Sequence, residues 1–448
     1  MSCVFGVNDI RGLYPEELDE TMAYRVGLAL PGVLAGKSVV VGRDVRLSSP
    51  ALAKALTQGL TDGGCDVLDI GLCGTEMIYF ATAHYGLDGG VMVTASHNPR
   101  EYNGLKIVGR EARPLAGTSA WEALKEQVLS GKKLPQPGGG SVRRFEVLLD
   151  YMAKLLSFVE IDCLHALRVV ADVGNGAAGL VLDALQEHLP SIELIRLHAV
   201  PDGSFPHGAP NPLLPEQREA AAQAVRKYGA DLGVAWDGDF DRCFFYDERG
   251  NFVDSCYMVG FLAQAFLKKH GSECIVHDPR CVWNTIELTN AYGGTAVICQ
   301  GGHALIKAKM RETGAVYGGE MSAHHYFRDF YYCDSGMVPW LLVLELLSRE
   351  GRKLSELLME RQALFPVSGE INRRVADAQS VLVRLEKQYG KGNKVSHLDG
   401  LTVESSKWRF NLRPSNTEPG LLRLNVETRG DSAFCKHLTE QLLLDIDS

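Results

Sequence analysis

Apolar runs of strand length alternate with helix-like stretches along most of this chain. The runs Ser38–Val41, Asp66–Ile70 and Gly90–Val93 are separated by amphipathic stretches at 50–62 and 76–84. Neighbouring strands that are joined through helices usually pair in parallel, because the chain must cross over the sheet to return. The alternation therefore predicts an α/β fold with mainly parallel sheets.

The same alternation occurs in three sets of similar length, and a different pattern follows them. The second set begins at Leu167–Ala171, and the third begins near the helix-like stretch 256–268. From about Phe365 the chain has short strand-like runs and a closing helical stretch at 432–444, which is typical of an α+β domain. We expect three related α/β domains with mixed sheets and a smaller C-terminal α+β domain. The expected boundaries are 1–150, 151–252, 253–365 and 366–448.

Composition narrows the class of protein. The chain has 448 residues, of which 46% are hydrophobic and 23% charged, and its net charge is -9. This composition is typical of a globular protein, and the acidic balance argues against a nucleic-acid partner. The longest apolar stretch, 338–347, is too short to span a bilayer, and no secretion signal is visible at the amino end. The 11 cysteines form no C-x-x-C pair. We expect reduced thiols, a cytoplasmic location and no membrane association.

The segment Thr94–Pro99, with the sequence TASHNP, follows the apolar run Gly90–Val93 directly. Ser96 therefore lies at the carboxyl end of a predicted strand, where open α/β sheets bind their ligands. A hydroxyl in that position can act as a nucleophile or as a phosphate carrier. The turn at 103–105 brings a cation, Lys106, back to the same neighbourhood. Taken alone, the segment is equally consistent with a serine that caps a turn.

Three aspartates follow the predicted strand 231–236 at alternate positions: Asp237, Asp239 and Asp241. In an extended loop, alternate side chains point to one side, so these carboxylates are expected to converge. Carboxylates at that spacing repel one another unless a cation joins them, and oxygen ligands suit Mg²⁺. A helix-flanked calcium loop is excluded because Arg242 occupies the position that needs glycine. A solvated polar turn remains the alternative.

Two further polar loops are candidates for ligand binding. The loop 318–325, with the sequence GGEMSAHH, follows a strand predicted at 315–317, and its carboxylate and hydroxyl suit the hydroxyls of a sugar. The loop 413–420, with the sequence RPSNTEPG, combines a guanidinium, two hydroxyls and a tight turn, as a phosphate cradle does. An ordinary loop or a capped turn is the alternative for each.

These four segments, in this order, resemble the motifs of the α-D-phosphohexomutases, and among them the bacterial phosphomannomutase/phosphoglucomutase type. Supporting matches are DIRG at 9–12, GRDVR at 42–46, GH at 302–303 and YCDSG at 332–336. The resemblance covers essentially the whole chain. It implies four domains around a central cleft, each of which contributes one loop.

The resemblance also implies residue roles. Ser96 would carry the phosphoryl group, and its phosphate would complete a Mg²⁺ site with Asp237, Asp239 and Asp241. The implied catalytic residues are Ser96, His97, Lys106, Arg11, Arg242 and His303. The implied substrate-binding residues are Arg43, Arg280, Glu320, Ser322, His324, Arg413, Ser415, Asn416, Thr417 and Arg423. Two positions depart from the pattern: Arg280 stands where relatives often have lysine, and Asn8 stands where several have tyrosine.

The implied reaction is an isomerisation that interconverts mannose 6-phosphate and mannose 1-phosphate through a hexose 1,6-bisphosphate. One Mg²⁺ per chain and the bisphosphate as activator are expected, with hexose phosphates as small-molecule partners and GDP-mannose synthesis as the pathway supplied. We expect a monomer or a homodimer. The alternatives are a glucose-phosphate or dual-specificity mutase, a metal-dependent phosphatase that uses Ser96 transiently, and a non-catalytic sensor of sugar bisphosphates.

Overall fold

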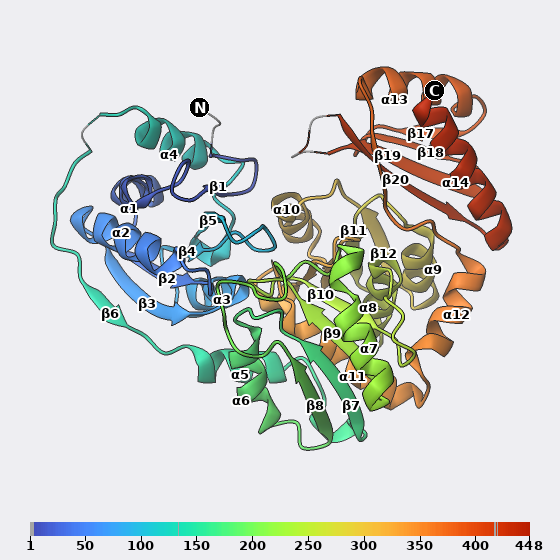
Figure 1. Ribbon diagram of the computed structural model, residues 1–448, viewed down its shortest axis with the longest axis horizontal. Coiled ribbons are helices and arrows are strands. Elements are labelled where there is room, and N and C mark those ends of the chain that lie inside the picture. Colours follow the sequence, from blue (N-terminus) through green and yellow to red (C-terminus); the bar gives the residue numbers. More distant parts are fainter. Residues whose placement is uncertain (1–3, 133, 416–417, 419) are drawn as a thin grey trace. The chain divides into compact units, whose positions relative to one another are not determined.

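The computed structural model describes residues 4–132, 134–415, 418 and 420–448. It has a four-domain α/β architecture: three α/β domains with mixed sheets and a smaller C-terminal domain (Figure 1). By packing, the chain divides into two compact units. The first unit comprises Met1–Phe252 and His324–Gly351, and the second comprises Val253–Ala323 and Arg352–Ser448. The expected domain boundaries stay predictions.

The first sheet of the first unit has the strand order β1-β5-β4-β2-β3-β6. Strands β2, β3, β4 and β6 are parallel, whereas β5 is antiparallel to β4, and β1 to β5. The antiparallel pair places Arg11 on β1 and Lys106 on β5, beside the strand that ends before Ser96. The bounds are β1 Ile10–Leu13, β2 Ser38–Arg43, β3 Asp66–Leu72, β4 Gly89–Val93, β5 Tyr102–Gly109 and β6 Val142–Arg144.

Helices cover this sheet through one apolar layer. Leu52, Leu56 and Leu60 recur every four residues and face the same core as Val39 and Val91 of the sheet. Asp19 caps the first helix by accepting a hydrogen bond from the backbone of Met22 at 2.8 Å. The helices of this part are α1 Glu20–Leu34, α2 Ser49–Asp62, α3 Thr75–His84, α4 Ser119–Leu129 and α5 Leu148–Leu156.

The second sheet of the first unit has the order β10-β9-β7-β8, in which only β10 runs antiparallel to its neighbour. Strand β9 is buried along its whole length and leads into the aspartate loop. A short hairpin, β14–β15, and the buried helix α11 complete the unit. The bounds are β7 Leu167–Asp172, α6 Ala178–Gln186, β8 Ile192–Leu197, α7 Glu219–Tyr228, β9 Leu232–Trp236, β10 Cys243–Tyr246, β14 His325–Phe327, β15 Cys333–Asp334 and α11 Met337–Glu350.

The second unit contains the parallel strands β12, β11 and β13 and the C-terminal sheet. The C-terminal sheet has the order β16-β20-β19-β18-β17, and every neighbouring pair is antiparallel. Helices α13 and α14 pack on it through one apolar core. The bounds are α8 Ser255–His270, β11 Cys274–His277, α9 Trp283–Ala291, β12 Thr295–Ile298, α10 His303–Thr313, β13 Tyr317–Gly319, α12 Leu354–Leu364, β16 Ile371–Arg374, α13 Ala378–Tyr389, β17 Lys394–Ser396, β18 Leu401–Glu404, β19 Trp408–Pro414, β20 Leu421–Thr428 and α14 Ser432–Asp447.

Two global expectations can be compared with the structure. Every described cysteine is free, and most of these thiols are buried. Burial raises the pKa of Cys65 to about 12 and that of Cys299 to about 11, so both thiols stay protonated at neutral pH. Among the helices of the described residues, none has the length and hydropathy that a bilayer crossing requires.

A buried carboxylate joins helix α3 to helix α11. Glu76 is fully buried in the first turn of α3 and accepts a hydrogen bond from the Tyr151 hydroxyl. Its other partners are the Ser335 hydroxyl at 2.9 Å and the backbone N–H groups of Gly336 at 2.5 Å and Met337 at 3.2 Å. Glu76 therefore supplies the acceptor for N–H groups that the first turn of α11 cannot pair internally.

We predict that Glu76 makes the stability of the protein depend on pH. Burial raises the pKa of Glu76 to about 8 from 4.5, although its hydrogen bonds oppose the shift. Between these values the folded protein holds a proton that the unfolded chain has released. The contribution is therefore full below about pH 4.5 and is lost as the pH rises through about 8. Relative to Glu76→Gln, the wild-type free energy of unfolding should fall by about 1 kcal/mol per pH unit in this window. Denaturant unfolding at several pH values measures the difference, and Glu122→Gln on the exposed side of α4 is the control. A difference that stays constant between pH 5 and 8 would contradict this.

Candidate active site

Ser96 lies in the turn that follows β4, as its sequence position predicts. Its side chain is buried, and its Oγ donates a hydrogen bond to Asp237 Oδ2 at 2.8 Å. The same Oγ lies 3.2 Å from His97 Nδ1. Ser96 has a φ of 51°, in the left-handed region that residues other than glycine rarely occupy. The serine hydroxyl therefore contacts the carboxylate only while the backbone of Ser96 keeps this unfavourable conformation.

The three aspartates after β9 converge, as predicted. Carboxylate oxygens of Asp237, Asp239 and Asp241 lie within 4.8 Å of one another, and all three residues are buried. The expected reason for the convergence, an extended loop with alternating side chains, is wrong. The backbone N–H of Phe240 donates to Asp237 O at 3.0 Å, and Phe240 has a φ of 44°, so the loop is a tight turn.

A glycine lets this turn approach the serine loop closely. A Cβ atom on Gly238 would lie 2.7 Å from the carbonyl oxygen of Ser96, a distance that real Cβ atoms essentially never show. Thr75, at the start of α3, fixes the other side of the turn. Its hydroxyl donates to Asp239 Oδ2 at 2.5 Å, and its N–H donates to Asp239 O at 3.0 Å. The turn is therefore clamped between two segments of the first domain.

Lys106 and Arg242 supply positive charge at the aspartate cluster. The ammonium group of Lys106 donates to Asp239 Oδ2 at 2.7 Å and to Asp241 Oδ2 at 2.5 Å. Arg242 Nε lies 3.4 Å from Asp237 Oδ2. Burial by itself would lower the pKa of Lys106, but Asp239 and Asp241 outweigh burial and raise it. Lys106 is therefore protonated at neutral pH.

The cluster fits a divalent cation. Burial, and then Asp241 and Asp239, raise the pKa of Asp237 well above its ordinary value, so three ionised carboxylates here lack sufficient positive charge. Asp239 Oδ1 is buried and accepts no hydrogen bond from the described residues. Closely spaced carboxylate oxygens of this kind are the ligands that Mg²⁺ takes in proteins.

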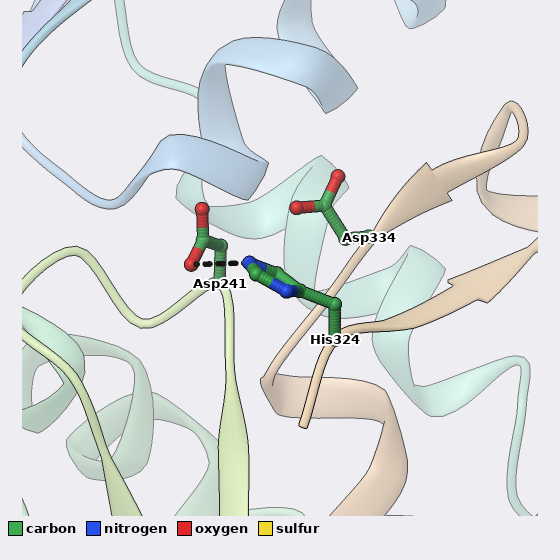
Figure 2. A group of neighbouring side chains, drawn as sticks. All are labelled: Asp241, His324 and Asp334. Carbon is green, nitrogen blue, oxygen red and sulfur yellow. Dashed lines mark ion pairs between the residues drawn. The ribbon is translucent and has the colours of Figure 1, made fainter. Parts of the chain in front are cut away.

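Two histidines lie beside the serine and the aspartates. Arg242 Nη2 donates to His97 Nδ1 at 2.9 Å, and Arg242 Nε donates to His324 Nε2 at 3.2 Å. Burial, and then the charge of Arg242, lower the pKa of His97, so its imidazole is neutral at pH 7. Figure 2 shows His324 directed toward Asp241, 3.7 Å away, with Asp334 of β15 nearby. Sequence reasoning gave Asp334 no role.

Arg11 reaches the serine loop from the edge strand β1. Its Nη1 donates to Asn98 Oδ1 at 2.7 Å and to Ala95 O at 3.3 Å, and its Nη2 forms an ion pair with Asp9. The predicted group Ser96, His97, Lys106, Arg11 and Arg242 is therefore gathered within the first unit. We call these residues, with the three aspartates, the carrier site.

The second unit holds the predicted sugar loop. Glu320 is buried just after β13, and its Oε1 accepts a hydrogen bond from Gly302 N at 2.8 Å. Arg280 Nη2 lies 3.7 Å from the same oxygen, and Ser322 follows in the loop. The strand before this loop was predicted at 315–317 but spans Tyr317–Gly319, because Gly318 and Gly319 pair with β11.

Three arginines surround one carboxylate in the second unit. Glu370 lies 3.6 Å from Arg280 Nη1, and it accepts hydrogen bonds from Arg413 Nη2 at 3.3 Å and Arg423 Nη1 at 3.2 Å. Arg423 Nη2 also donates to Ser415 Oγ at 3.4 Å. Burial would raise the pKa of Glu370, but the arginines outweigh burial and lower it. We call these three arginines and Glu370 the arginine cluster.

The four other predicted residues are Arg43, His303, Asn416 and Thr417. Arg43 ends strand β2, where it pairs with Val93 of β4, and it lines a cavity of about 330 Å³ together with Lys54 and Asp69. His303 begins helix α10 in the second unit. Asn416 and Thr417 lie outside the described residues.

Sequence reasoning missed residues that act through long-range contacts. Asp278 pairs with Arg280 and accepts a hydrogen bond from Met321 N at 2.6 Å, while Glu370 organises the arginine cluster. Neither belongs to a motif. Arg46 was part of a quoted motif, yet its contacts with the Ser96 loop depend on the folded chain.

We predict that Asp239→Asn weakens divalent-cation binding by about 100-fold or more, because one anionic ligand is replaced by a neutral amide. Calorimetric titration of the purified protein with Mg²⁺ measures the affinity, and the rise in melting temperature on adding Mg²⁺ should shrink in parallel. Asp183→Asn, at an exposed ion pair with Arg196, is the matched control. Equal Mg²⁺ affinity in Asp239→Asn and the wild type would remove this turn as the metal site.

Known proteins resemble the chain along its whole length. The family models for phosphoglucomutase/phosphomannomutase match as α/β/α domains I, II and III at residues 2–133, 149–250 and 254–365, and as the C-terminal domain at 370–443. A Xanthomonas campestris protein named "Phosphohexose mutases" is 51% identical over 98% of both chains. A phosphomannomutase of Salmonella montevideo is 49% identical over 99% of both. The crystal structure of a phosphoglucomutase/phosphomannomutase family protein from Burkholderia thailandensis, 31% identical, has a TM-score of 0.88 and covers 100% of this chain and 98% of its own. The chain belongs to the phosphoglucomutase/phosphomannomutase family.

Proposed function

We propose that the protein is a phosphomannomutase that interconverts mannose 6-phosphate and mannose 1-phosphate. The observation that carries the proposal is the contact of Ser96 Oγ with Asp237 inside a buried cluster of three aspartates. Full-length relatives named phosphomannomutase, 48–50% identical to this chain, support the choice of sugar. Mannose 1-phosphate would then supply GDP-mannose synthesis in the cytoplasm.

Ser96 is proposed as the carrier of the phosphoryl group. Phospho-Ser96 would donate its phosphoryl group to the free hydroxyl of the substrate and form a hexose 1,6-bisphosphate. After the sugar has turned around, Ser96 would take back the other phosphoryl group, so the enzyme ends each cycle phosphorylated. A free hexose 1,6-bisphosphate would activate enzyme that has lost its phosphoryl group.

The charges around Ser96 suit this transfer. Arg11, Lys106 and Arg242 are cationic side chains with contacts in the carrier site, and they would stabilise the oxygens of the transferring group. Bound by Asp237, Asp239 and Asp241, a magnesium ion would withdraw charge from the phosphoryl oxygens. The positive charge around the serine would thus stabilise a phosphate dianion, which the aspartates alone would repel.

The protonation state of each side chain limits which of them can donate or accept a proton in the reaction. The attacking hydroxyl must lose a proton, and the Ser96 oxygen must gain one when it is released. Asp239 and Asp241 raise the pKa of Lys106, so this side chain holds its proton and cannot be the base. Burial and Arg242 lower the pKa of His97, and its Nδ1, 3.2 Å from Ser96 Oγ, already accepts a hydrogen bond from Arg242 Nη2 at 2.9 Å. Of the candidates His303, His324 and Lys106, we therefore propose one of the two histidines as the base.

The second unit is proposed to hold the substrate. Arg280, Arg413 and Arg423 would bind the phosphate that does not react, with Ser415, Asn416 and Thr417. Glu320 and Ser322 are proposed to bind sugar hydroxyls, whereas His324, in the first unit, is proposed to flank the transfer site. A site that binds the sugar in both orientations must contact hydroxyl groups that exchange places when the sugar makes a half-turn. Such a site does not distinguish the configuration at C2, so glucose phosphates are the alternative substrates.

Ser96→Ala tests the function. We expect the variant to keep the fold and its melting temperature while kcat falls by about 10⁴-fold or more, because the carrier oxygen is lost. Purified wild-type protein incubated with mannose 1-phosphate, Mg²⁺ and a trace of hexose 1,6-bisphosphate should form mannose 6-phosphate without free phosphate, as followed by ³¹P NMR. Intact-mass analysis should find one phosphoryl group on the wild type and none on Ser96→Ala. Steady release of free phosphate would indicate a phosphatase, and faster turnover of glucose 1-phosphate a glucose-specific mutase. Wild-type turnover in Ser96→Ala would remove the carrier role.

We predict that Arg413→Ala raises KM for mannose 1-phosphate by about 10- to 100-fold, because a charge-assisted contact with the phosphate is lost. Its Mg²⁺ affinity should equal that of the wild type, since the aspartates are unchanged. Arg373→Ala, on strand β16 of the same sheet and paired with Asp447, is the control. Equal losses in substrate and metal affinity would show that the arginine cluster has another role.

A further inference from the structure

The backbone of Ser96 occupies a conformation that the chain has to enforce. Its φ of 51° costs free energy for any residue with a Cβ atom. The next residues form a turn, in which Asn98 N donates to Ala95 O at 3.0 Å. If the loop relaxed to a negative φ, Oγ would point in another direction and lose its 2.8 Å contact with Asp237. Something outside the loop must therefore hold it.

Both terminal nitrogens of the Arg46 guanidinium donate hydrogen bonds to backbone carbonyls of this loop. Its Nη2 donates to Ser96 O at 2.9 Å and to Asn98 O at 2.7 Å. Its Nη1 donates to Pro99 O at 2.7 Å and to Tyr102 O at 2.9 Å. The side chain is completely buried. A planar fork with fixed N–H directions suits this task because it orders four carbonyl oxygens at once.

The amide of Ser96 is connected to Asp44, the carboxylate that pairs with Arg46. The N–H of Ser96 donates to Thr94 Oγ1 at 2.8 Å, and that hydroxyl donates to Asp44 Oδ2 at 2.7 Å. Asp44 Oδ2 also accepts from Arg46 Nε at 3.1 Å. The Ser49 hydroxyl donates to Asp44 Oδ1 at 2.5 Å. Thr94 is thus a relay that connects the amide of Ser96 to Asp44. Asp44 in turn pairs with Arg46, which holds the carbonyl of Ser96.

A segment of the second domain covers the ion pair. The Phe205 ring lies 5.2 Å from the Arg46 guanidinium, and Arg46 forms an isolated parallel backbone bridge with Gly203. A Cβ atom on Gly203 would lie 2.1 Å from Val45 O, so only glycine allows this approach. The cover keeps water from the guanidinium, and a pair without water holds its geometry more strongly.

We propose that Arg46, Asp44 and Thr94 are positioning residues for phosphoryl transfer at Ser96. The Asp44–Arg46 pair fixes the carbonyl of Ser96 directly and its amide through Thr94, and so directs Oγ toward Asp237. The inference rests on the proposed role of Ser96 as carrier. Transfer to and from a serine oxygen requires an in-line approach, so a loop free to rotate would lose rate without losing substrate.

Thr94→Val and Thr94→Ser test the relay as a matched pair. Valine keeps the shape of threonine but neither accepts from the Ser96 amide nor donates to Asp44, whereas serine keeps the hydroxyl. We expect Thr94→Val to lower kcat by about 100-fold while KM stays within about threefold. The rate at which hexose 1,6-bisphosphate phosphorylates Ser96, followed by intact mass, should fall with kcat. Thr94→Ser should recover most of both rates.

The outcomes separate this proposal from the function on which it rests. A wild-type enzyme that carries no phosphoryl group on Ser96 after incubation with hexose 1,6-bisphosphate overturns the carrier role and the positioning role together. A labelled wild type with equal labelling rates and kcat in Thr94→Val overturns the positioning role alone, as does an equal loss in Thr94→Ser. If Thr94→Val does not fold, Arg46→Lys carries the test. Its single ammonium cannot span four carbonyls, so kcat should fall and KM should hold; an unchanged kcat overturns the proposal.

Discussion

Burial of three carboxylates beside a serine costs free energy, and the first unit is organised around it. Asp237, Asp239 and Asp241 repel one another in a site that water does not reach. Lys106 lies against two of them, and Arg242 lies near the third. The strand order explains why these groups meet: β5 runs antiparallel beside β4 and carries Lys106, while the aspartate turn follows the buried strand β9. The cost of the cluster favours any ligand that brings positive charge to it.

The two units carry different chemistry. The first unit holds the serine, the acidic turn and His97, whose imidazole is kept neutral by burial and by Arg242. The second unit holds three arginines that pair with the carboxylate of Glu370 and are kept together by it. An anion that binds them meets guanidiniums already oriented, so little ordering is needed when it binds.

The sequence predicted the strands and loops better than the contacts between them. β4 and the serine turn were predicted from an apolar run that Asn98 and Pro99 end, because that signal is local. Helices α9, α12 and α13 were not predicted, and α9 mixes polar and β-branched residues without a clear apolar stripe. The convergence of the aspartates was predicted, but the turn at Phe240 that produces it was not. The roles of Arg46 and Glu370 depend on partners that are distant in the sequence, so no local pattern reveals these roles.

The free cysteines have a practical consequence. Cys73 and Cys243 are fully enclosed, and burial raises the pKa of both thiols. Because the thiolate is the species that reacts with alkylating reagents, these two side chains react little in the native protein. Each enclosed sulfur becomes reactive once the chain opens. Maleimide or iodoacetamide labelling of Cys73 and Cys243 thus reports the unfolded fraction of the population.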